Sequence, residues 1–129
     1  MDDAARARQG MTVRRAVLGD EHVDRAVATT TSFTEPFQDF ITRNAWGDIW
    51  SRPGLSRGER SMITLAMLAA LQHENELAMH VRAALRNGLT PEQIESALEP
   101  AGYLGATDAF VTAAVAAHEA LDAQLSKEG

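Results

Sequence analysis

The amino-acid sequence predicts an all-α protein built as one domain. Apolar residues make up 45% of the 129-residue chain. Most of them are Ala and Leu, which favour helices. They recur at helical spacing in several segments, and no segment shows the sustained alternation of a half-buried strand. A chain of this length suits a single domain.

Composition excludes several classes of function. The formal net charge of -6 argues against a nucleic-acid or anionic-membrane partner. The chain has no cysteine, which excludes disulfides, thiolate metal sites and thiol redox chemistry. The N-terminus has no apolar signal segment, and the longest apolar run, MITLAMLAAL, is shorter than the roughly 20 residues of a membrane-spanning helix. We therefore expect a soluble, cytoplasmic protein.

Residues 1–19 are predicted to be an N-terminal arm, which another subunit could order. The segment is polar and basic, and Gly10 and Gly19 interrupt it. Arg14 and Arg15 form the one small basic cluster of the chain.

The remaining residues, 20–129, are predicted to form the helical domain. Asp20 is a plausible N-cap of its first helix, and Thr34 of its second. In the second helix an apolar face is expected at i, i+3 and i+4, formed by Phe37, Phe40 and Ile41. A turn at Arg52-Pro53-Gly54 ends this region.

The middle of the chain predicts a pair of helices. Ser56 and Glu59 are spaced as a capping box, and the helix they open, ERSMITLAMLAALQ, is apolar almost all round. That pattern is typical of a central buried helix. The next helix is expected from about Glu74 to Asn87, where Gly88 stops it.

Two further helices are predicted near the C-terminus. Thr90 and Gln93 form a second capping box. The helix that follows should be short, because Pro100 and Gly102 are expected to break it. The last helix should run from near Thr107 to about Leu125.

The densest polar cluster of the chain contains His73, Glu76 and His80, which would share one helical stripe. A carboxylate four residues before an imidazole can orient the ring and favour its protonated form, so the pair could move a proton near neutral pH. Two other interpretations remain open. The pair could be an exposed salt bridge of little consequence, or the cluster could hold zinc, although no HExxH motif is present.

Other polar and aromatic residues are weaker candidates. Arg52 and Arg60 flank the turn before the buried helix and could bind a carboxylate, or could be ordinary surface arginines. Trp46 and Trp50, at i and i+4, favour a core or interface anchor over a ligand site. Tyr103 lies between two glycines in an expected turn.

Several strings of this chain resemble the γ-carboxymuconolactone decarboxylase family. The resemblance covers roughly residues 13–98, and its most specific strings are HVDRA, AWGDIWSRPGL and ELAMHVRAA. It implies an all-helical bundle of the alkylhydroperoxidase-like type, a ring-shaped homotrimer or homohexamer, and no cofactor or metal. The implied reaction is decarboxylation of 4-carboxymuconolactone to 3-oxoadipate enol-lactone in protocatechuate (β-ketoadipate) catabolism.

The resemblance also implies site residues. Redox proteins of the wider superfamily carry a Cys-x-x-Cys-x-x-x-His motif, and the matching frame here is His73-x-x-Glu76-x-x-x-His80. Both cysteine positions hold other residues, while His80 is kept. We predict that His80 is the proton donor and that Glu76 orients it. The predicted substrate-binding residues are Arg52, Arg60, Trp46, Ser61, His73 and Tyr103.

The segment from Leu98 to Asp108 departs from the family pattern and is shorter. This difference favours an alternative, in which the chain acts on another small lactone or carbonyl substrate, for example in a biosynthetic pathway. A third interpretation is a helical assembly protein that forms the oligomer but has no catalytic activity.

Overall fold

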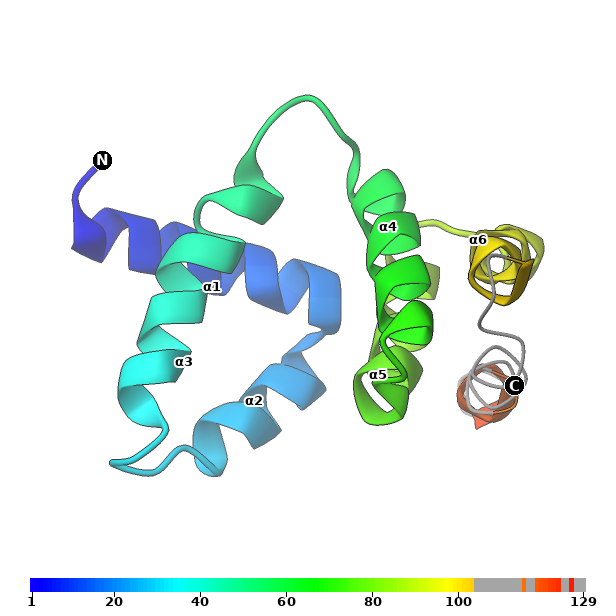
Figure 1. Cartoon of the computed structure of the whole chain (residues 1–129). Coiled ribbons are helices and arrows are strands. Elements are labelled where there is room, and N and C mark those ends of the chain that lie inside the picture. Colours follow the sequence, from blue (N-terminus) through cyan, green and yellow to red (C-terminus); the bar gives the residue numbers. More distant parts are fainter. Residues whose placement is uncertain (104–114, 116–117, 124–125, 127–129) are drawn as a thin grey trace. The chain divides into compact units, whose positions relative to one another are not determined.

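The computed structural model describes residues 1–103, 115, 118–123 and 126, with only the backbone of residues 101–103. The regular elements in these residues are all helices, which confirms the predicted all-α class. The chain divides into two compact units, Met1–Ser56 and Arg57–Gly129. Each unit is described by itself (Figure 1).

The N-terminal unit consists of helices that pack around α1. In order they are α1 (Asp3–Leu18), α2 (Asp20–Ala28), α3 (Glu35–Ile41), the π-helix η1 (Thr42–Trp46) and the 3-10 helix η2 (Ile49–Ser51). Helix α1 packs mainly on η1 and also contacts α2 and η2. In Figure 1 the cyan α3 continues directly into η1.

The segment that was expected as an arm forms helix α1. The Asp2 side chain caps it by accepting a hydrogen bond from the Ala5 N–H at 2.7 Å. One face of the helix is buried within the unit, at Gly10, Val13, Arg14 and Val17. These positions are spaced i, i+3, i+4 and i+7, which is the pattern of a packed helix. Glycine at position 10 disguised this pattern, because glycine usually interrupts a helix.

Two glycines allow α1 and η1 to approach closely. A Cβ atom at Gly10 would collide with the carbonyl oxygen of Thr42, and one at Gly47 would lie 2.5 Å from the carbonyl oxygen of Arg6. Trp46 ends η1 in the buried part of the unit, and its ring centroid lies 5.2 Å from that of Trp50. In this unit Trp46 is therefore a core residue, as its spacing predicted.

The predicted starts of α2 and α3 are correct to within one residue. Gly19 occupies the N-cap of α2, so Asp20 is its first residue. Thr34 is the N-cap of α3, although its side chain makes no capping hydrogen bond. Phe37 and Phe40 of α3 are exposed rather than buried, at 64% and 54%.

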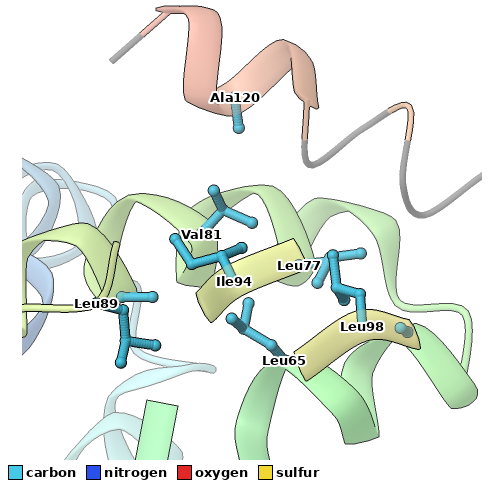
Figure 2. Packing of buried hydrophobic residues seen from close by; sticks show 9 residues of the cluster. Leu65, Leu77, Val81, Leu89, Ile94, Leu98 and Ala120 are labelled. Carbon is cyan, nitrogen blue, oxygen red and sulfur yellow. The ribbon is translucent and has the colours of Figure 1, made fainter. Parts of the chain in front are cut away.

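The C-terminal unit contains α4 (Arg57–Ala70), α5 (Glu74–Arg86) and α6 (Pro91–Tyr103). Helix α4 packs on both α5 and α6. Figure 2 shows side chains of all three helices meeting in one apolar cluster. The buried members are Leu65, Ala69, Leu77, Val81, Ala84, Leu89, Ile94, Leu98 and Ala120.

Helix α4 is central to this unit, but it is not buried all round as predicted. Its buried residues are Ser61, Leu65 and Ala69, spaced i, i+4 and i+8. A second row, Ile63, Met67 and Leu71, is exposed. The prediction was wrong because the described helices of the unit cover only one side of α4.

Local sequence signals end α4 and α5. After α4, the His73 N–H donates to the Leu68 carbonyl and the Gln72 N–H to the Ala69 carbonyl, which is the Schellman arrangement. Gln72 then takes the left-handed conformation, with φ of 61°. Helix α5 ends in the same way at Gly88, as predicted.

The start of α6 is confirmed and its length is corrected. The Thr90 N–H donates to Gln93 Oε1 at 2.9 Å, and the Gln93 N–H donates to Thr90 Oγ1 at 3.1 Å, so the capping box forms. The helix then continues through Pro100 to Tyr103. Pro100 has no N–H to donate to the Ser96 carbonyl, so one helical hydrogen bond is missing near the C-terminal end of α6.

Most of the predicted last helix, Thr107 to about Leu125, lies outside the described residues, although residues 118–123 are helical. The altered segment from Leu98 to Asp108 is described only as far as Tyr103. None of the described helices is long and apolar enough to cross a membrane.

Candidate active site

The predicted proton donor, His80, lies on the inner side of α5. Its side chain is buried, with 9% exposure, and it stands beside Leu77, Val81 and Ala84, which are fully enclosed. An imidazole here is shielded from bulk water, which strengthens its electrostatic interactions with a bound group.

Glu76 does not meet His80 in the single chain. It lies in the exposed first turn of α5, and no hydrogen bond or ion pair of Glu76 is formed with any described residue. Helix N-termini carry unpaired N–H groups and a partial positive charge that favour a carboxylate. Because the first turn also offers water, Glu76 stays solvated there instead of turning toward the buried ring.

His73 stands just before α5 rather than on its helical stripe. It is the N-cap residue, with φ of -89° and ψ of 78°, and its side chain makes no capping hydrogen bond. Its side chain is exposed. The predicted stripe of three residues is therefore reduced to Glu76 and His80, because the helix begins at Glu74.

A hydrogen bond between Ser61 and Asn87 joins α4 to the end of α5. Asn87 Nδ2 donates to Ser61 Oγ at 3.0 Å, and Ser61 is fully buried. Asn87 is the C-cap residue that follows α5. It was not predicted, because it pairs with a residue 26 positions earlier in the chain.

The two candidate arginines have different surroundings. In the N-terminal unit, Arg52 forms a two-pronged ion pair with Asp48, with Nε at 2.8 Å from Oδ1 and Nη2 at 3.2 Å from Oδ2. The hydrogen bond from Arg52 lowers the pKa of Asp48, and the same contact raises the pKa of Arg52. In the C-terminal unit, Arg60 is half-buried on α4, next to Ser61.

The described residues offer a hollow away from the predicted site and no metal-binding group. A hollow of about 290 Å³ in the N-terminal unit is lined by Asp3, Ala4, Ala7, Asp39 and Arg43, and none of the predicted site residues lines it. Within the part of the chain that the structure describes, no group of three or more His, Asp or Glu side chains could hold a metal ion. Tyr103 is the last residue of α6, and its side chain lies outside the described part.

The C-terminal unit thus holds buried polar groups on two helices. His80 provides a buried imidazole on α5, and the buried Ser61 hydroxyl accepts a hydrogen bond from the Asn87 amide where α4 meets the end of α5. Such groups can deliver a proton and hold oxygen atoms next to an apolar wall.

Residues 35–120 match the model of the Carboxymuconolactone decarboxylase family. The chain belongs to this family. The match spans α4, α5 and α6, and it includes the part of the N-terminal unit from α3 onward.

Similar proteins of this family are named as decarboxylases. The chain is 48% identical over 95 residues to a 4-carboxymuconolactone decarboxylase of Acinetobacter baylyi, covering 74% of this chain and 71% of the relative. It is 38% identical over 120 residues to the nitrosuccinic acid decarboxylase npaB of Metarhizium robertsii, covering 92% and 83%. A 4-carboxymuconolactone decarboxylase sequence of Pseudomonas putida is 54% identical over 48 residues, covering 37% of this chain and 100% of the relative. The carboxymuconolactone decarboxylase family member described here is thus placed among the carboxy-lyases.

Proposed function

We propose that this chain decarboxylates 4-carboxymuconolactone to 3-oxoadipate enol-lactone, without a cofactor, as a homo-oligomer in protocatechuate catabolism. The observation that carries the proposal is the buried imidazole of His80 on α5, in a chain 48% identical to a relative named for this reaction. The family match supports the reaction type, and the relative supports the substrate.

The reaction requires few groups from the protein. The bond to the carboxylate breaks, carbon dioxide leaves, and the electron pair passes through the conjugated double bond to the lactone carbonyl oxygen. A hydrogen-bond donor at that oxygen stabilises the developing negative charge. One proton must then be delivered to carbon, and His80 supplies it. The ring regains its proton from water, so each turnover consumes one proton.

The test is carbon dioxide release from 4-carboxymuconolactone, compared between two matched variants. His80→Gln should lower kcat by about 10²- to 10⁴-fold, because it removes the general acid. His118→Gln is the control, since His118 is exposed, beside Asp122. Equal activity of the two variants would refute the role of His80, and no turnover by the unaltered protein would refute the proposed substrate.

Glu76 enters the proposal as the residue that orients His80 once substrate is bound. The two residues are four apart on one helix, which is within contact distance for long side chains. Glu76→Gln should lower kcat by about tenfold, because a neighbouring carboxylate favours the protonated imidazole. Glu74→Gln is the matched control, because Glu74 is an exposed carboxylate of the same helical turn. If both variants lose the same activity, Glu76 acts only on the start of the helix.

The remaining predicted site residues are proposed to bind the substrate. Arg52 and Arg60 would hold its carboxylates, since a guanidinium binds a carboxylate through two parallel hydrogen bonds. Ser61, on the buried side of α4, would hydrogen-bond an oxygen atom. The other proposed contacts are His73, Trp46 and Tyr103. Replacement of a binding residue should raise KM more than it lowers kcat.

A second candidate function is decarboxylation of a different activated acid. The relative named nitrosuccinic acid decarboxylase covers 92% of this chain, more than the 74% covered by the muconolactone relative. A nitro group next to the reacting carbon can accept the electron pair in place of a conjugated carbonyl. The same buried acid could then complete the reaction. Carbon dioxide release from nitrosuccinic acid but not from 4-carboxymuconolactone would select this function over the first.

Self-association is supported by apolar side chains that the described chain leaves exposed. The row on α4 is 49%, 57% and 60% exposed at Ile63, Met67 and Leu71. Contiguous exposed apolar residues of this size are typical of association surfaces. We propose a homotrimer or homohexamer in which such surfaces are covered.

A further inference from the structure

Arg14 is a buried cation without a carboxylate partner in the described chain. Its side chain is only 6% exposed, on the inner face of α1. Nη2 donates to the neutral Gln38 Oε1 at 3.1 Å, and Nε is enclosed without a hydrogen-bond partner among the described residues. Arginine is almost never buried to this extent unless a negative charge accompanies it.

The neighbouring Arg15 has the carboxylate partners that Arg14 lacks among the described residues. Arg15 is half-buried, and its Nη1 pairs with Asp24 at 2.8 Å and with Asp20 at 3.1 Å. The hydrogen bonds that Arg15 donates to Asp24 and then to Asp20 raise the pKa of Arg15. Burial, followed by repulsion from Arg15, lowers the pKa of Arg14. The more exposed arginine therefore has two carboxylates, while the more buried one has none.

The helix that Arg14 contacts carries exposed aromatic residues. Its hydrogen-bond partner Gln38 lies on α3 between Phe37 and Phe40, which are 64% and 54% exposed, and Phe33 just before α3 is 91% exposed. Exposed aromatic residues together with arginine are the composition of protein–protein contacts. The chain carries 18 acidic residues and a net charge of -6, so a second copy offers many carboxylates.

We propose that Arg14 forms a carboxylate-binding site at a contact between two copies of this chain, occupied by an acidic side chain of the second copy. The carboxylate accepts hydrogen bonds from the guanidinium and neutralises its charge, while the aromatic residues of α3 are covered by the same contact. This inference rests on the self-association in the proposed function. It does not depend on the identity of the substrate.

The test measures assembly as a function of protein concentration, by sedimentation and by the thermal unfolding midpoint. Arg14→Met should raise the concentration of half-assembly by at least about tenfold, because truncating one partner of a buried ion pair leaves the other unpaired. Arg14→Lys keeps the charge and should raise it by less. Arg15→Met is the matched control. It should shift the concentration of half-assembly by no more than about twofold, since an ion pair at the surface of one copy contributes little.

Three outcomes would overturn the inference. Arg14→Met could leave the half-assembly concentration within about twofold of the unaltered protein, which would mean that no second copy contacts this charge. It could lower the unfolding midpoint equally at every concentration, which would place the carboxylate in the same chain. The unaltered protein could also be monomeric throughout. Carbon dioxide release is measured separately, so failure of the proposed reaction is distinguishable from all three.

Discussion

The close approach of α1 to η1 makes Gly10→Ala the most informative change in the N-terminal unit. Besides the Thr42 oxygen, the added Cβ would lie 2.9 Å from the Thr42 carbonyl carbon and 3.0 Å from the Gly47 nitrogen. Comfortable contact needs about 3.5 to 4 Å. All three atoms belong to the backbone, so the helices themselves must separate.

The expected loss of stability follows from two opposing terms. Overpacking of this kind costs about 1 to 3 kcal/mol, and a backbone clash belongs at the upper end. Alanine recovers about 1 kcal/mol, because it favours helix more than glycine does. The net loss should therefore be about 2 kcal/mol. With a denaturant slope of about 1 kcal/mol per M, the urea midpoint should fall by about 2 M.

The two tryptophans provide the assay for this prediction. The chain has two Trp residues, Trp46 and Trp50, and both lie in the N-terminal unit next to the contact. Their fluorescence therefore follows the unfolding of this unit in urea. Thr12→Ala, at an exposed position of the same helix, should change stability by no more than about 0.5 kcal/mol. A Gly10→Ala midpoint equal to or above that of the unaltered protein would refute the close contact between α1 and η1.

Three further predictions concern other parts of the chain. Gln72→Gly should raise the unfolding free energy by about 0.5 to 1 kcal/mol, measured by circular dichroism in denaturant, because Gln72 has a φ of 61° that glycine adopts without strain. Asp48→Asn should destabilise the protein at neutral pH but not in acid. Because Arg52 lowers the pKa of Asp48, the ion pair stabilises the folded protein above the usual aspartate pKa, and this stabilisation is lost as pH falls through the lowered pKa. A difference in unfolding free energy between the variant and the unaltered protein that does not change with pH would contradict this. Met67→Glu should shift the assembly toward smaller particles in light scattering, whereas Ser96→Glu, on the exposed side of α6, should not.

Much of the fold could be predicted because local signals end the helices. The capping box of Thr90 and Gln93 forms as the spacing indicates. Gly88 stops α5 with a φ of 94°, a conformation that favours glycine. Such signals involve residues a few positions apart, so a single sequence contains all the information that they need.

Features that depend on distant parts of the chain were missed. Taken alone, Gly10 predicts an interruption of the helix. Its close approach to Thr42 explains why a glycine occurs within α1. Pro100 alone predicts the end of a helix, yet α6 continues past it to Tyr103. The exposed row on α4 was predicted to be buried, because an apolar pattern does not tell whether the same chain or another one covers it.

The candidate site was predictable in part for the same reason. The burial of His80 follows from helical spacing relative to Leu77 and Val81, so a sequence can predict it. The contact between Asn87 and Ser61 joins residues 26 positions apart, and no local pattern specifies it. The i, i+4 spacing of Glu76 and His80 permits a contact but does not ensure it, because the Glu76 carboxylate can be solvated by water instead.

The proposed reaction places two demands on the surroundings of His80. Loss of carbon dioxide is favoured where the substrate carboxylate is poorly solvated. The ring must also regain a proton from water after each turnover. A ring with 9% exposure, beside the enclosed side chains of Leu77, Val81 and Ala84, is sheltered by apolar residues and still reaches the surface. The position of His80 therefore supports its proposed role as proton donor.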